Sequence, residues 1–272
     1  MNPVPSPDDD PPAAVPASTG PRPGLVRMRR RRRRAALLGL VSLGLTVAGV
    51  ALVRAGDAPR PPAEGRTAYG AGAGGRAAPP GYPVEGPGRF AAADGRSPVR
   101  GVDGPLRRYR VAVEEGTGQD VDAFAATVDE VLGDSRSWIG SGELRVQRVP
   151  EAAAADFTVY LATPATSERM CALGGLVTER YTSCRLPGQV IVNLARWMDG
   201  VPDYGAPLET YRTYVINHEV GHEFGEEHQA CPGPAEPAPV MQQQTYGLDG
   251  CVANAWPYVD GLRYEGEPTE GL

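Results

Sequence analysis

Lysine is missing from this sequence of 272 residues, in which all 27 basic side chains are arginine. Alanine, glycine and proline are abundant, so we interpret this absence as the codon bias of a GC-rich genome, without functional weight. Positive charge is also scarce after residue 53, where 19 arginines face 30 acidic residues. This balance of −11 excludes the broad basic surface that binds nucleic acid, and it predicts a soluble, acidic surface.

The first 53 residues have the opposite charge balance and favour a membrane anchor. Residues 1–34 are rich in proline and end in six arginines, which predicts a disordered tail. Residues 35–53 carry no charge, and a helix of this length approaches the roughly 30 Å hydrocarbon core. The flanking arginines predict a cytoplasmic N-terminus and an extracytoplasmic C-terminal domain at the cell membrane. A cleaved signal peptide is the alternative, but the apolar stretch exceeds the usual 7–15 residues and no A-x-A site follows.

The rest of the chain divides by composition. Residues 54–104 are rich in glycine, proline and alanine without periodicity, which predicts a linker. A folded domain is expected over 105–264, followed by a C-terminal tail over 265–272. Its pattern of strands and helices, the first helix capped by Asp120, predicts an α+β fold with a mixed, mostly parallel sheet packed on the second helix. The expected strands are 107–115, 143–149, 156–163 and 189–197, and the expected helices are 121–133 and 208–224.

Every histidine of the chain lies in the eleven residues HEVGHEFGEEH, from His218 to His228. His218 and His222 are four residues apart on the second predicted helix, so both project from one face and can bind one metal ion. Glu219 lies beside them, where its carboxylate can contact a water on the metal without binding the metal. Gly225 can take a left-handed conformation and end the helix, so that His228 supplies a third nitrogen. Three neutral imidazoles leave the fourth position of one Zn²⁺ ion open, as in catalytic sites.

Surface histidines and a structural zinc site are the alternatives to a catalytic site. Ordinary surface histidines would not be expected to gather in one motif in a chain that has no others. A closed structural zinc site needs a fourth ligand, for which Cys231 is the candidate, but an extracytoplasmic domain favours a disulfide there. The remaining acidic residues of the motif, Glu223, Glu226 and Glu227, are predicted to form a solvated face.

The four cysteines allow three disulfide pairings, of which we favour the sequential one. Cys171–Cys184 would close a loop between two strands. Cys231–Cys251 would connect the third histidine to the segment that follows it, and a loop of that size is worth roughly 3 kcal/mol in the chain-entropy model. No cysteine precedes Cys171, which excludes an N-terminal thiol as a plug on the metal.

The pattern H-E-x-x-H-x-x-G-x-x-H is matched at all five fixed positions and resembles the signature of the metzincin zinc peptidases. The resemblance implies a zincin-like fold with a methionine turn beneath the zinc, for which Met241 is the match. Some metzincins have a tyrosine two residues later; Gln243 stands there in this chain, and Tyr246 lies too far along to take that role. Metzincins bind substrate as a strand added to a sheet edge, and 189–197 resembles that edge strand by its order in the chain, although it is equally compatible with an ordinary strand.

A longer run, HEVGHEFGEEHQACPGPAEPAPVMQQQTYGLDGC followed by NAWP, resembles an actinobacterial family of membrane-anchored proteins, domain of unknown function 3152. The resemblance covers roughly 105–264. Together these features predict a zinc endopeptidase that cleaves a peptide or protein substrate in the cell envelope. Glu219 would take a proton from the water and pass it to the leaving amine. The alternatives are a zinc-stabilised domain that binds a cell-envelope ligand, and a zinc hydrolase of a cell-wall amide.

Overall fold

The computed structural model describes residues 81–269. Three predicted segments lie wholly or partly outside this range: the N-terminal tail over 1–34, the membrane span at 35–53, and the first part of the linker over 54–104. Within 81–269, no helix has the length and apolar composition that crossing a membrane requires.

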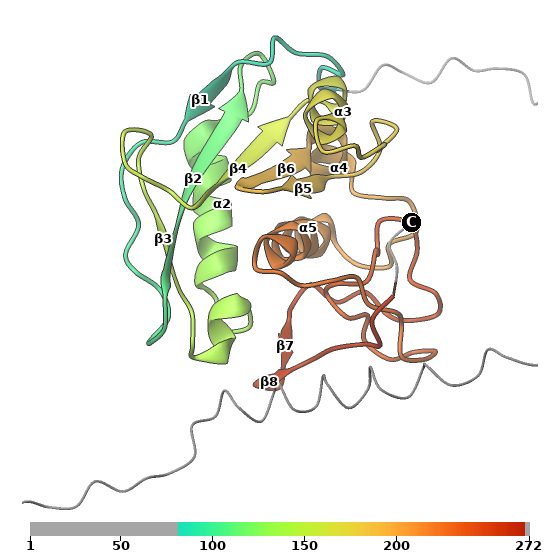
Figure 1. Ribbon diagram of the computed structural model, residues 1–272. Helices are drawn as coiled ribbons and strands as arrows, with labels where there is room; N and C mark the ends of the chain where they lie inside the picture. Colours follow the sequence, from blue (N-terminus) through green and yellow to red (C-terminus); the bar gives the residue numbers. More distant parts are fainter. Residues whose placement is uncertain (1–80, 270–272) are drawn as a thin grey trace, which may run out of the picture. The chain divides into compact units, whose positions relative to one another are not determined.

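A six-stranded sheet is the framework of the fold (Figure 1). Its strands follow the order β1-β2-β4-β6-β5, and β3 pairs with the start of β2. The strand pairs in the middle of the sheet are parallel, whereas β1 and β5 are antiparallel to their neighbours at the two ends. The expected α+β fold with a mostly parallel sheet is therefore confirmed. The strands are β1 Phe90–Ala92, β2 Leu106–Glu114, β3 Arg145–Arg148, β4 Phe157–Ala162, β5 Cys184–Leu186 and β6 Gln189–Asn193.

Helices pack on the sheet through two separate apolar clusters. α2 contacts β2 and β3, α5 contacts β5 and β6, and these two helices also contact each other. Figure 1 shows α5 between the sheet and the C-terminal part of the chain. α3 packs against β4, β5 and β6 through the smaller cluster, which includes Cys171 and Ile191. The helices are α2 Val121–Gly133, α3 Pro164–Ala172, α4 Leu194–Asp199 and α5 Leu208–Glu223, with a 3₁₀ turn at Trp138–Ser141 and a small hairpin of β7 Tyr258–Val259 and β8 Leu262–Arg263.

The larger hydrophobic cluster lies between the sheet and the helices α2 and α5. Val190 and Val192, which alternate along β6, point to this side and are fully buried. Phe124, Val128 and Leu132 of α2 fall on one helical face and join the same cluster, as their spacing predicts. Burying each such side chain is worth about 1.5–3 kcal/mol, so this layer fixes the position of the helix that carries the histidines.

The predicted strand 189–197 is shorter than expected. β6 ends at Asn193, whose side chain accepts a hydrogen bond from the backbone of Ala195 at 2.9 Å and so caps α4. The apolar run continues in the sequence because α4 is also buried, with Leu194 and Trp197 in the core. β6 lies between β4 and β5, so of the two alternatives for 189–197 the structure shows the ordinary strand, and β5 is the strand at that edge.

The folded part begins before residue 105, inside the segment predicted as a linker. β1 pairs with β2, and Ala93 donates from its backbone to the Val111 carbonyl at 2.9 Å. The Gly88 amide donates to the buried carboxylate of Glu114 at 2.7 Å. A three-residue strand is too short to show an alternating pattern, and its glycine- and proline-rich surroundings are typical of linkers. Residues 81–104 therefore belong to the fold, and the predicted boundary between 54–104 and 105–264 lies too late in the chain.

Candidate metal centre

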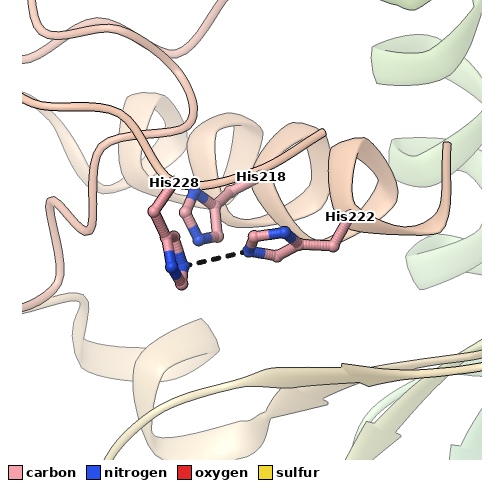
Figure 2. A group of neighbouring side chains, drawn as sticks. All are labelled: His218, His222 and His228. Atoms are coloured by element: carbon pink, nitrogen blue, oxygen red, sulfur yellow. Dashed lines mark hydrogen bonds between the residues drawn. The ribbon is translucent and has the colours of Figure 1, made fainter. Parts of the chain in front are cut away.

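The three histidines converge on one point (Figure 2). His218 and His222 project from the same side of α5, and His228 reaches them from the segment that follows the helix. One ring nitrogen from each lies within 4.8 Å of the others, and His222 Nε2 is 3.1 Å from His228 Nε2. Nitrogens bound to one tetrahedral ion at about 2.0–2.1 Å lie about 3.3 Å apart, so the cluster has the dimensions of a site that could hold a metal ion.

Backbone carbonyls orient two of the three rings. His218 Nδ1 lies 2.9 Å from the carbonyl oxygen of Val240, and His222 Nδ1 lies 2.9 Å from that of Glu226. A carbonyl can only accept, so in each neutral ring Nδ1 carries the hydrogen. The Nε2 lone pairs are then directed toward the common point, which is the arrangement found behind metal-binding histidines.

Burial keeps the histidines in their neutral form. Desolvation lowers the pKa of His218 well below its ordinary value, and the neighbouring His222 lowers it further. Desolvation also lowers the pKa of His222, and it lowers that of His228 from 6.5 to about 4, again with a contribution from His222. Metals bind the neutral imidazole, so these rings are in the binding form throughout the neutral pH range.

Glu219 is a buried carboxylic acid beside this cluster. Its residue is 6% exposed, and desolvation raises the pKa of its carboxyl group from 4.5 to about 8. A carboxyl group with such a pKa, in a pocket and next to possible metal ligands, is typical of a functional site. Near neutral pH it can hold a proton or give one up, whereas an exposed glutamate is fully ionised at that pH.

A tight turn beneath α5 carries Met241. The Gln242 amide donates to the Pro239 carbonyl at 2.9 Å, which closes the turn, and Met241 is completely buried. Tyr214 of α5 holds the same segment: its hydroxyl donates to the Gln242 carbonyl and accepts from the Gln244 amide, both at 2.9 Å. The turn therefore supports the helix from below.

The close contact between α5 and this turn depends on a glycine in the middle of the histidine motif. A Cβ added to Gly221 would lie 2.5 Å from Met241 Sδ and 2.6 Å from Trp138 Cζ2, and both side chains are buried. We therefore expect Gly221→Ala to destabilise the fold by about 1–3 kcal/mol through overpacking. Thermal unfolding measures this loss. Gly233→Ala is the matched control, because nothing lies within 4 Å of its added Cβ, and equal stability of the two variants would contradict the tight packing.

Gly225 has the left-handed conformation that the motif predicts. It directly follows Phe224, the C-cap residue of α5, and its φ is +93°. The Glu226 amide donates back to the Gly221 carbonyl at 3.0 Å, which turns the chain toward His228. The local sequence thus accounts for the reversal that brings the third histidine to the other two.

The C-terminal segment 266–269 is hydrogen-bonded to the chain around the third histidine, His228. The Thr269 amide donates to the His228 carbonyl at 2.9 Å, and the Ala230 amide donates to the Glu267 carbonyl at 2.9 Å. The Gly266 amide donates to the Gln229 side chain at 3.2 Å. Residues 266–269 therefore belong to the fold, although the sequence places them in a C-terminal tail over 265–272. No local pattern marks such a segment, because its partners lie 37 to 41 residues earlier.

Two disulfides are present, as predicted, and they join the cysteines in sequential order. Cys171–Cys184 connects the end of α3 to β5, and Cys231–Cys251 connects the segment after His228 to the segment after the turn. Cys231 is therefore in a disulfide and does not close the histidine cluster. Both disulfides brace elements that border the candidate site.

Glu223 does not lie on the solvated face that the sequence predicts, so that prediction is wrong. Its side chain is 5% exposed and accepts from Arg185 Nε at 2.7 Å and from the Gly188 amide at 3.2 Å. Arg107 Nη2 lies 3.6 Å from the other carboxylate oxygen of Glu223. Glu223 follows His222 directly, so these contacts fix the end of α5 against the edge strand β5. No local sequence signal marks this residue, because both arginines come from distant strands.

A pocket of about 670 Å³ opens at the histidines. Glu219 and the histidines form its floor, 175–178 and 182–185 form one wall, and residues beyond the methionine turn, including Gln243 and Tyr246, form another. Neither Gln243 nor Tyr246 has a role predicted from the sequence, yet both line the pocket. The site thus combines three convergent imidazoles, one buried carboxyl group and a cavity large enough for part of a peptide.

Comparison with curated proteins and with solved structures finds no match. A protein-family model described as a protein of unknown function, DUF3152, matches residues 78–255. The match begins just before the first described residue and includes all three histidines, Glu219 and Met241. The chain belongs to the DUF3152 family.

Proposed function

We propose that this protein is a metzincin-like zinc endopeptidase. The observation that carries the proposal is the convergence of three neutral imidazoles beside the buried carboxyl group of Glu219, at the floor of a pocket. Three histidine ligands with an open fourth position are the donor set of catalytic zinc, whereas structural zinc sites are closed by four protein ligands. The turn that carries Met241 beneath the helix also supports the resemblance to metzincins.

The chain's own residues account for the proton transfers of peptide hydrolysis. A zinc ion on the three imidazoles would supply Lewis-acid chemistry, polarising a carbonyl and lowering the pKa of its water to about 7. Glu219 accepts a proton as the water oxygen bonds to the carbonyl carbon, and it returns the proton to the nitrogen as the C–N bond breaks. Burial raises the pKa of Glu219 to about 8, and a cation at the histidines would lower it again, so the zinc-loaded chain holds a carboxylate that can accept the first proton and return it in the second transfer.

The edge strand β5 supports a peptide as the substrate. It ends the sheet above the histidines, and its residues Cys184 and Arg185 line the pocket. An extended peptide can add to such an edge through backbone hydrogen bonds, with its scissile bond over the metal centre. The disulfide from Cys171 and the contacts of Glu223 keep this edge at a fixed distance from α5.

The proposed location is outside the cytoplasm, with the domain tethered through the span at 35–53. Two disulfides in one domain are typical of proteins in oxidising compartments, which supports this placement. The proposed substrate is therefore a peptide or protein of the cell envelope.

Cleavage of a mixed peptide library tests the proposed function. The full-length chain, purified in mild detergent, is expected to cleave the library when loaded with one equivalent of zinc, to lose activity on chelation, and to recover it when zinc is restored. Mass spectrometry of the products gives the cleavage sites. If the folded, zinc-loaded chain left the library intact, the peptidase proposal would fail. Release of amines from cell-wall fragments instead would favour the amide hydrolase, and binding of such fragments without turnover would favour the binding domain.

A further inference from the structure

Exposed apolar side chains gather in the segment between α3 and β5. Leu173, Leu176, Val177 and Tyr181 have exposed fractions of 82, 42, 78 and 36%. They are four of the ten large hydrophobic residues that are exposed within 81–269, although they occupy only nine positions of the chain. A concentration of this kind on a soluble domain is typical of a surface that binds something apolar.

This segment forms a wall of the pocket at the histidines. Leu176 and Val177 line the same cavity as His222 and Glu219. Tyr246 lines it from the loop after the methionine turn, and its ring lies 6.1 Å from that of Tyr181. The apolar surface is thus continuous with the candidate metal centre.

The backbone of the segment is anchored at several points. The disulfide of Cys171 with Cys184 closes it, and the amide of Arg180 donates to the carboxylate of Glu168. Asn193 Nδ2 donates to the Arg180 carbonyl at 2.9 Å.

The exposed ring of Tyr181, in the same segment, is also held by a neighbouring side chain. The guanidinium of Arg196 lies 4.4 Å from the centre of the Tyr181 ring, a favourable cation–π contact. Anchoring of this kind lowers the entropic cost of binding, because the apolar side chains are already in position.

We propose that residues 173–181 form an apolar subsite that selects peptides with a bulky hydrophobic side chain next to the bond over the metal centre. The inference rests on the proposed function, in that the occupant is an extended peptide. A peptide added along β5 would come within reach of Leu176 and Val177, because these two side chains line the same pocket as the β5 residues Cys184 and Arg185. The polar residues of the floor then face the peptide backbone, while the apolar wall faces one side chain.

Binding of labelled peptides to a non-cleaving variant tests the subsite. The full-length Glu219→Gln chain, loaded with zinc, is titrated with fluorescein-labelled octapeptides of Gly, Ala and Ser in which a single Leu occupies each position in turn. We expect one or two positions at which Leu tightens binding about tenfold over Ser, the gain that burying such a side chain supplies. Adding Leu176→Ser and Val177→Ser should remove this preference, so that the Leu and Ser peptides bind with equal affinity.

Val252→Ser is the matched control, because Val252 is 51% exposed and does not line the pocket. It should keep the preference, and all variants should retain one zinc ion and the same unfolding temperature. A preference that survives the double substitution, or equal binding of all peptides, would overturn the inference. So would a double variant whose only change is weaker association with lipid vesicles or with a second copy of the chain.

The two proposals fail in different ways. If the unmodified chain cleaves the library without any preference for hydrophobic residues, the subsite is wrong and the peptidase stands. If Leu peptides bind selectively but the unmodified chain cleaves none of them, the subsite stands as a peptide-binding surface and the peptidase is wrong.

Discussion

Replacing Glu219 by Gln is expected to lower kcat/KM for peptide cleavage about 10²- to 10⁴-fold, the usual contribution of a general acid–base group. Gln has the same shape and fits the buried position of Glu219, but its amide cannot accept the proton of the attacking water. The three histidines are unchanged, so the variant should still bind one zinc ion. The measurement is a comparison of library cleavage by the two zinc-loaded chains, with metal content determined on the same samples.

Asp and Ala at the same position sharpen this test. Glu219→Asp keeps a carboxylate base in a side chain shorter by one methylene, so it should lose less activity than Glu219→Gln. Glu219→Ala has no base and should lose as much activity as Glu219→Gln. Glu227→Gln is the control, because Glu227 is an exposed glutamate of the same motif. Cleavage by Glu219→Gln at the rate of the unmodified chain would show that the proton moves through another group, and the proposed mechanism would then be wrong.

The parts of the site that could be predicted from sequence are those whose determinants are close together in the chain. His218, His222 and His228 lie within eleven residues, and helical spacing with one left-handed glycine is enough to bring them together. The start of α2 at its Asp120 cap is local in the same sense, since the side chain accepts from the Ala123 amide at 2.8 Å. Such features need no knowledge of the rest of the fold.

The parts that could not be predicted depend on partners far along the chain. β1 is a strand only because β2 lies beside it, and 266–269 are fixed only because they pair with the chain around His228. Glu223 looks like one of several acidic residues on a helix end until Arg107 and Arg185 are brought to it by two strands. The sequence leaves open whether 189–197 is an edge strand or an ordinary strand for the same reason, because the residues of a strand do not indicate which strands pair with it.

Zinc affinity is expected to rise with pH by up to about tenfold per unit as the pH approaches 8. Without metal, Glu219 keeps its proton up to about pH 8. A divalent cation at the histidines favours the carboxylate and lowers this pKa, so zinc binding below pH 8 releases the proton. One proton released per ion bound corresponds to a tenfold change in affinity per pH unit. Above pH 8 the carboxylate is already ionised, and its contribution to the dependence ends.

Glu219→Gln separates this proton from any that the ligands release. The histidines have lowered pKa values, so they are already neutral above pH 6.5 and release none. Zinc affinity of the variant should therefore rise less steeply between about pH 6.5 and 8, because only the water on the zinc, with a pKa of about 7, still releases a proton. Isothermal titration calorimetry in two buffers of different ionisation enthalpy counts the released protons directly. Equal proton release by both chains would show that zinc binding does not ionise Glu219, and the expected contribution of this carboxyl group would then be wrong.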